Sequence, residues 1–159
     1  MKTNIKSLLL SIVSLAVFSF IFTSCDDDGD TTPPVINLIE PEDGDVLKIG
    51  SDIHFDMELS DNETLKSYKV EIHENMSKPH DHGNSLKSGS DTEYFSYQNT
   101  WLDIEGLRNT SVHHHQIVIP ENATPGAYHM VVYCFDSAGN ESHVAINIEL
   151  SHDGEVHEH

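Results

Sequence analysis

Cysteine and positive charge are both scarce in this sequence of 159 residues. The two cysteines are Cys25, near the start, and Cys134. If Cys25 is modified, Cys134 has no partner, which excludes a disulfide framework and leaves packing or a metal to hold the domain. Lys and Arg number 8 against 27 Asp and Glu, for a formal net charge of −19. Such a chain repels nucleic acid, which is not expected as a partner, and attracts cations.

The first 24 residues have the pattern of a secretory leader. Two lysines precede a run of apolar and small residues from 7 to 23, too short and too close to the start for a transmembrane span. The run ends in IFTSC, residues 21–25, which resembles a lipobox, although Phe22 stands where an aliphatic residue is usual. We predict a lipoprotein signal peptide over 1–24 and lipidation of Cys25. The alternative is an ordinary cleaved leader with a chance cysteine.

An acidic segment follows the predicted lipidation site. Asp26, Asp27 and Asp28 resemble a signal for transfer to the cell surface in some Gram-negative lipoproteins. Asp, Gly, Thr and Pro make up the rest of 25–34, which predicts a flexible tether. Removal of the two lysines of the leader would change the formal net charge from −19 to −21. The predicted location is the outer membrane, with the domain exposed on the cell surface.

Beyond the tether, apolar and polar residues alternate in short runs separated by turn residues, and no helix of any length is indicated. The runs cover residues 35–39, 53–59, 68–72, 93–101, 112–119, 128–134 and 144–150. About seven such strands predict an all-β, immunoglobulin-like antiparallel β-sandwich over 35–150, followed by a disordered, histidine-rich tail over 151–159. The alternation places Phe55, Met57, Val70, Ile72, Val132, Ile146 and Ile148 in the core.

Particular segments of this pattern are similar to known modules. Residues 33–39 resemble the entry of many bacterial immunoglobulin-like domains, and residues 126–140, from Gly-Ala-Tyr to Gly-Asn, resemble their last hairpin. More narrowly, residues 68–75 with His80 and His82, together with the Gly-Ala-Tyr-His at 126, resemble a family of immunoglobulin-like surface lipoproteins of unknown function. The resemblance covers most of the predicted domain. It implies a fold and a location, with little chemistry.

Twelve histidines carry the clearest chemical signal. We predict six of them as ligands of a transition metal: His73, His80, His82, His113, His115 and His129. His113 and His115 share one face of a strand, as do His80 and His82 if that segment is extended. In an immunoglobulin-like arrangement the strand that ends at His73 pairs with the one that begins near Tyr128. His73 and His129 then become cross-strand neighbours.

Imidazole with nearby carboxylate favours zinc or copper over calcium or magnesium. Taken singly, His54, His114 and His143 are interpreted as histidines of an acidic surface without a metal, and the tail histidines would hold ions only weakly. An alternative that needs no metal is a pH response, since exposed histidines gain charge near an ordinary pKa of about 6.5.

Two other kinds of site compete with this one. The turn at residues 61–63 and the turn at Asp136 and Asn140 meet at one end of the predicted sandwich, where oxygen ligands would suit calcium. Tight turns use the same residue types without an ion, and we favour that simpler interpretation. For catalysis, Cys134 lacks the following His and Met of a blue-copper site, and no nucleophile elbow is present. An enzyme is not predicted.

The sequence therefore predicts a lipid-anchored surface protein whose immunoglobulin-like domain binds zinc or copper. The alternative is an adhesion or scaffold module that binds a surface protein or glycan without a metal. An exposed groove of Tyr94, Phe95, Tyr97 and Trp101 would favour that alternative, because such partners dock on aromatic side chains.

Overall fold

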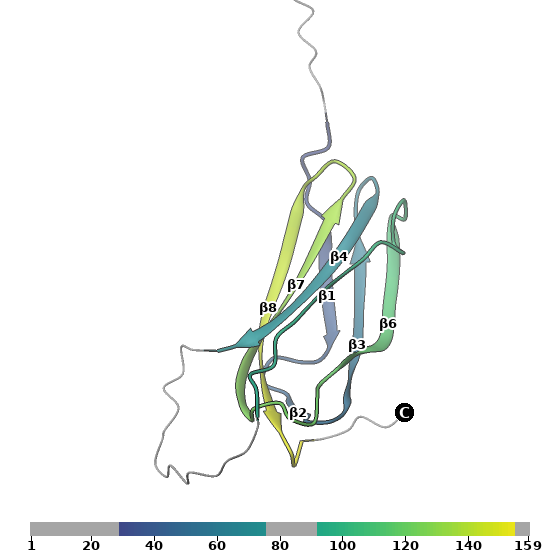
Figure 1. The fold of residues 1–159 in the computed structure, drawn as a ribbon. Helices are drawn as coiled ribbons and strands as arrows, with labels where there is room; N and C mark the ends of the chain where they lie inside the picture. Colours follow the sequence, from purple (N-terminus) through teal and green to yellow (C-terminus); the bar gives the residue numbers. More distant parts are fainter. Residues whose placement is uncertain (1–28, 76–91, 155–159) are drawn as a thin grey trace, which may run out of the picture.

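The computed structural model describes residues 29–75 and 92–154, which form eight β-strands in two sheets (Figure 1). The strands are β1 (Val35–Glu40), β2 (Val46–Lys48), β3 (Asp52–Ser60), β4 (Leu65–Glu74), β5 (Tyr97–Trp101), β6 (Asn109–Val118), β7 (Gly126–Asp136) and β8 (Glu141–Ser151). None of the described residues forms a helix with the length and hydropathy that crossing a bilayer requires. The predicted leader, His80 and His82 lie outside the described residues.

The two sheets have the order of an immunoglobulin-like sandwich. One sheet runs β1-β3-β6 and the other β2-β8-β7-β4-β5. The chain thus crosses between the sheets after β1, β2, β3, β5 and β6, and the crossings after β3, β5 and β6 are those of that fold. The predicted β-sandwich is confirmed, with one strand more than expected: β2 has three residues, too few for an alternating pattern, and runs parallel to β8. β5 is shorter than predicted, because Glu93 forms only an isolated bridge to Ala123.

The strands define two ends of the sandwich. β1 begins at the end that holds the β3–β4 and β7–β8 turns, since Val35 pairs with Ser60 and Leu65 with Asp136. β8 finishes at the opposite end, where Leu150 pairs with Gly126. We call these the proximal and the distal end.

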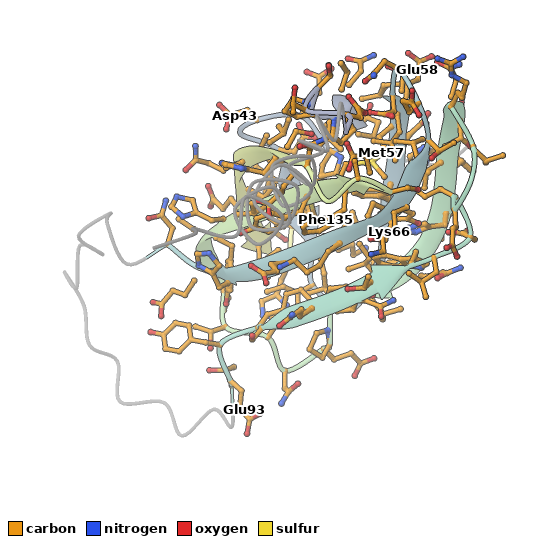
Figure 2. The ribbon with its side chains drawn as sticks, turned by 90° about the horizontal axis from the view of Figure 1, so that it is seen from above. Asp43, Met57, Glu58, Lys66, Glu93 and Phe135 are labelled. Carbon is orange, nitrogen blue, oxygen red and sulfur yellow. The ribbon has the colours of Figure 1, made fainter. Side chains whose placement is uncertain are left out.

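The predicted core is confirmed in full. All seven side chains are buried, from Phe55 at 0% exposed to Ile146 at 8%. Figure 2, a view from above, shows Met57 between the sheets while the next residue, Glu58, points outward, as the two-residue period of a strand requires. Cys134 is also buried, and burial is the main reason that the pKa of its thiol rises to about 12. That thiol is structural, because a thiol of raised pKa forms little reactive thiolate.

A stack of aromatic rings closes the sandwich where β5 faces β6. The ring of Tyr68 lies 4.8 Å from that of Trp101, and the imidazole of His114 lies 5.0 Å from both Trp101 and Phe55. Burial lowers the pKa of His114, so its imidazole belongs in this stack as a neutral ring. The indole Nε1 of Trp101 donates to Oε1 of Gln116 at 2.8 Å and ties β5 to β6.

Two buried tyrosines differ in how their hydroxyls are satisfied. Tyr128, near the start of β7, donates to the carbonyl of Thr124 at 2.7 Å and accepts from the amide of Phe95 at 3.3 Å. A tyrosine that bonds back to the backbone at this point is typical of immunoglobulin-like sandwiches. The hydroxyl of Tyr68 is buried and has no hydrogen-bond partner among the residues that the structure describes.

Candidate metal centre

A β-bulge between β3 and β6 shapes the outer face of the three-stranded sheet. Ile53 pairs with Ile117 and Phe55 pairs with His114, so two residues of β6, His115 and Gln116, stand opposite the single residue His54. The alternation on β6 places His114 toward the inside and its two histidine neighbours outside, and it changes phase at Gln116, which is also exposed, so that Ile117 is again buried. Bulges re-aim side chains in this way and are common beside functional sites.

The imidazoles of His113 and His115 lie beside the bulge, next to the ring of His54. The ring centroid of His54 lies 4.8 Å from that of His113 and 4.9 Å from that of His115. One ligating atom each from His54, His113 and Asp56 lie within 4.8 Å of one another. Zinc ligands at 2.0–2.1 Å in a tetrahedron are roughly 3.4 Å apart, so small side-chain rotations bring these atoms to metal-bond length. We call His54, His113 and His115, with Asp52 and Asp56, the histidine face.

Asp52 orients one of these imidazoles. Its Oδ2 lies 2.7 Å from Nδ1 of His115, at the distal end of β3. A carboxylate that accepts from one ring nitrogen fixes the tautomer and leaves the other nitrogen as a ligand, the arrangement found around protein-bound zinc. His115 therefore offers Nε2 as a further donor beside His54 and His113.

The predicted pairing of His73 with His129 is present on the other sheet. The two residues are register partners on β4 and β7, and their ring centroids are 5.6 Å apart. They lie on the five-stranded sheet, whereas His113 and His115 lie on the three-stranded one, so these four predicted ligands cannot share one ion. Among the described residues, no Asp, Glu, Cys or further His lies close enough to His73 and His129 to form a group of three possible metal ligands with them.

Sequence reasoning missed three members of the histidine face: His54, Asp52 and Asp56. All three alternate with the core residues of β3, so their outward direction was readable. Their position beside His113 and His115 depends on which strand pairs with β3 and on the bulge, and neither follows from the spacing of residues along the chain.

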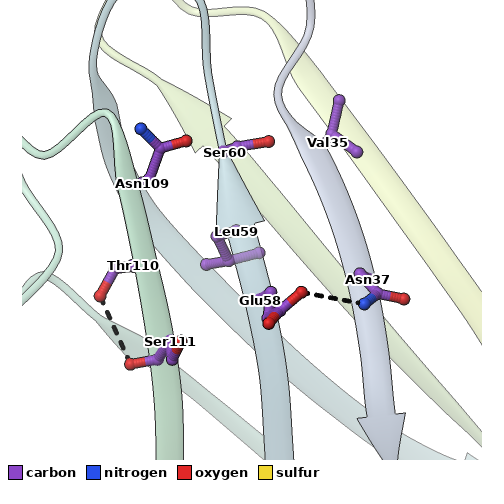
Figure 3. A pocket seen from close by; sticks show the side chains of 8 residues that line it. All are labelled: Val35, Asn37, Glu58, Leu59, Ser60, Asn109, Thr110 and Ser111. Carbon is purple, nitrogen blue, oxygen red and sulfur yellow. Dashed lines mark hydrogen bonds between the residues drawn. The ribbon is translucent and has the colours of Figure 1, made fainter.

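A polar hollow lies on the same outer face, toward the proximal end (Figure 3). It holds about 530 Å³ and is lined by residues of β1, β3 and β6, among them Asn37, Glu58 and Ser111. Nδ2 of Asn37 donates to Oε2 of Glu58 across it at 3.2 Å. The aromatic groove that would favour an adhesion module is absent from the described surface, because Phe95 and Trp101 are buried, at 7% and 9% exposed, and of the four rings only Tyr94 is well exposed.

A second group of possible ligands lies at the proximal end. Asp30, Asp61 and Asp136 each place one carboxylate oxygen within 4.8 Å of the others. The sequence placed Asp61 and Asp136 at one end of the sandwich, as the structure does, and did not include Asp30, which precedes β1. This group, called here the carboxylate cluster, contains oxygen donors alone.

These features define an immunoglobulin-like β-sandwich with two groups of possible metal ligands. Over residues 23–151 the chain matches DUF4625, a domain of unknown function, and it belongs to that family. The resemblance to a family of unknown function is thereby confirmed. No curated protein matches the chain. Among solved structures, a DUF4466 family protein from Parabacteroides merdae is similar at a TM-score of 0.45 and 12% identity, over 77% of this chain and 46% of that one. The chain thus spans about half the length of that protein.

Proposed function

We propose that this protein is a surface lipoprotein of the outer membrane that binds one transition-metal ion, zinc or copper, on its histidine face. His54, His113 and Asp56 are the ligands, His115 is a further donor, and Asp52 orients it. The observation that carries the proposal is the convergence of ligating atoms from His54, Asp56 and His113 within 4.8 Å. The protein captures or buffers the ion and catalyses no reaction.

The donor set and the surrounding charge favour this class of metal. Imidazole nitrogens with one carboxylate suit zinc and copper better than calcium or magnesium, which prefer oxygen alone. The formal net charge of −19 raises the local concentration of cations around the whole chain. The histidine face is also on strands rather than on a loop, and ligands on rigid elements need little reorganisation to bind.

The adhesion alternative has less support. Its aromatic groove is not formed, since the rings of Phe95 and Trp101 are in the core. The hollow of Figure 3 is lined mainly by polar side chains and offers no aromatic platform for a sugar. A protein or glycan partner therefore remains the second hypothesis.

Calorimetry on the whole chain, purified in detergent without an affinity tag and stripped of metal, tests the function. We expect one zinc or copper ion to bind per chain, with an affinity that falls as the pH is lowered, because protons compete for neutral imidazole. Deleting the tail from His152 onward should leave this binding in place, since the histidine face is in the folded domain. Binding that disappears with the tail, or no stoichiometric binding, would contradict the proposal.

The lipid anchor makes a separate prediction. Changing Cys25 to Ala should move the protein from the membrane fraction to the soluble fraction, because the acylated thiol is the proposed attachment. Fractionation and mass spectrometry of the N-terminal peptide measure this, with Cys134→Ala as the control that keeps the anchor. Membrane attachment that persists in the Cys25→Ala protein would refute the anchor and leave the metal proposal intact.

A further inference from the structure

The outer face of the five-stranded sheet differs in charge from the rest of the molecule. Its outward positions carry three lysines and three glutamates: Lys48, Lys66, Lys69, Glu71, Glu141 and Glu149. The outward positions of the three strands opposite carry Asp52, Asp56 and Glu58 and no Lys or Arg. We call the outward side of β8, β7, β4 and β5 the neutral face, because its charges cancel in a chain of formal net charge −19.

Apolar side chains run along the middle of the neutral face. On β7, which lies between β8 and β4, Val131, Tyr133 and Phe135 alternate with buried core residues and point outward. Each is half-buried by its neighbours on the sheet, and no described strand lies over them (Figure 1). Outward positions of a solvated sheet are ordinarily polar, so a row of this kind marks a surface that associates with a partner.

The charges at the centre of the neutral face are satisfied within the chain. Nζ of Lys69 lies 3.0 Å from Oε1 of Glu71 and 4.0 Å from the centre of the Tyr133 ring. The hydroxyl of Tyr133 donates to Oε2 of Glu71 at 3.3 Å. A charge that is paired and hydrogen-bonded loses its remaining water at lower cost than an isolated one. A partner can therefore cover this region without leaving an unpaired charge.

We propose that the neutral face is the interface of a homodimer whose two-fold axis runs along β7. Two copies that each carry a formal charge of −19 repel one another, and the repulsion is smallest across a face with no net charge. Because β4 and β8 flank β7 on its two sides, this axis places β4 of one copy opposite β8 of the other. The dimer goes beyond the proposed metal binding and does not depend on it.

The register of the strands favours this axis. Phe135 of β7 pairs with Glu141 of β8 on one side and with Ser67 of β4 on the other. Lys66, the extra residue of the β-bulge next to Ser67, therefore lies at the level of Glu141. An axis along β7 brings Lys66 of each copy opposite Glu141 of the other, within reach across sheets packed about 10 Å apart. An axis across the strands would instead bring Glu141 opposite Glu149, and these like charges would repel.

The neutral face has the size of a modest dimer interface. β8, β7 and β4 have eleven, eleven and ten residues. Four strands about 4.8 Å apart and about 33 Å long span roughly 600 Å², whereas a standard interface buries about 800 Å² on each partner. Dimerisation in solution should therefore be weak. The axis along β7 points both proximal ends the same way, so two copies with the proposed anchor would meet at a high effective concentration in one membrane.

Sedimentation velocity of the whole chain in density-matched detergent, over a range of concentrations, tests the interface. The native chain should form dimers at the higher concentrations. Lys66→Glu and Glu141→Lys should each weaken the dimer by roughly tenfold or more, because each brings like charges together twice, and the double variant should restore it. Val131→Glu, near the axis, should abolish the dimer. Val35→Glu is the matched control, since it adds the same charge to an exposed valine of the three-stranded sheet and should leave the dimer unchanged.

Carbodiimide cross-linking of mixed isotope-labelled and unlabelled native chains adds a direct readout. A Lys66–Glu141 link between two chains, with rescue by the double variant, supports the interface. Dimers that form equally in all variants indicate shared micelles or another surface and overturn the proposal. A native chain that stays monomeric at every concentration also overturns it and leaves this face to a protein or glycan partner. Calorimetric zinc binding should be equal in all variants, which separates failure here from failure of the histidine face.

Discussion

Replacing His54 and His113 together with Ala should weaken zinc binding by roughly 100-fold or more, because two of the converging ligands are removed. Replacing His73 and His129 together should change the affinity less than threefold, on the order of half a kcal/mol, if the histidine face holds the ion. The two double variants remove the same residue types from the two sheets. Each pair is exposed or half-buried on an outer face, so neither change opens a cavity in the core.

Asp52→Asn refines this test. The amide oxygen of Asn is neutral and accepts from His115 more weakly than a carboxylate does, and loss of such an orienting partner typically costs about 10- to 100-fold in metal affinity. Titration calorimetry at fixed pH gives the affinities, and far-ultraviolet circular dichroism checks that every variant keeps its strands. Weak binding by the His73/His129 variant with intact binding by the His54/His113 variant would transfer the site to the five-stranded sheet.

The two buried tyrosines should respond to loss of the hydroxyl in opposite directions. Tyr68→Phe should raise the free energy of unfolding by about 1 kcal/mol, because a buried oxygen without a partner is removed from a stacked ring that stays in place. Tyr128→Phe should lower it by about 1–3 kcal/mol, because the carbonyl of Thr124 and the amide of Phe95 lose their partner.

Urea unfolding followed by circular dichroism measures both changes from the shift in midpoint at constant slope. Each substitution removes one oxygen from a ring that is at most 1% exposed, so the pair controls for the size of the change. A loss of stability in Tyr68→Phe as large as that in Tyr128→Phe would show that the Tyr68 hydroxyl has a partner in solution, such as a buried water.

The fold was predictable because the pattern that indicates each strand lies within a short run of consecutive residues. Alternation along β3, β4, β7 and β8 marks one buried face, so Met57, Val70 and Val132 could be placed in the core from the sequence alone. The pairing of His73 with His129 followed once the strand order was assumed. β2 was missed because three residues show no period.

The candidate sites were predictable only in part, because they depend on contacts between distant segments. His113 and His115 are two residues apart, and that spacing was visible, whereas the bulge that brings them to His54 is a register shift between two strands. Asp30 reaches the carboxylate cluster from a segment whose composition predicted only a flexible tether. Neither the register shift between β3 and β6 nor the position of Asp30 can be predicted from the residues next to them in the sequence.

β1 begins and β8 finishes at opposite ends of the sandwich, and this arrangement sets how far from a lipid surface each group would be held. β3 spans nine residues and β8 spans eleven, or roughly 30 and 36 Å at about 3.3 Å per residue. An anchor at Cys25 would put the proximal end, with Asp30, next to the bilayer. His54 and His115, toward the distal end of the same strands, would then face outward about two nanometres above it, within reach of ions and proteins in the surrounding medium.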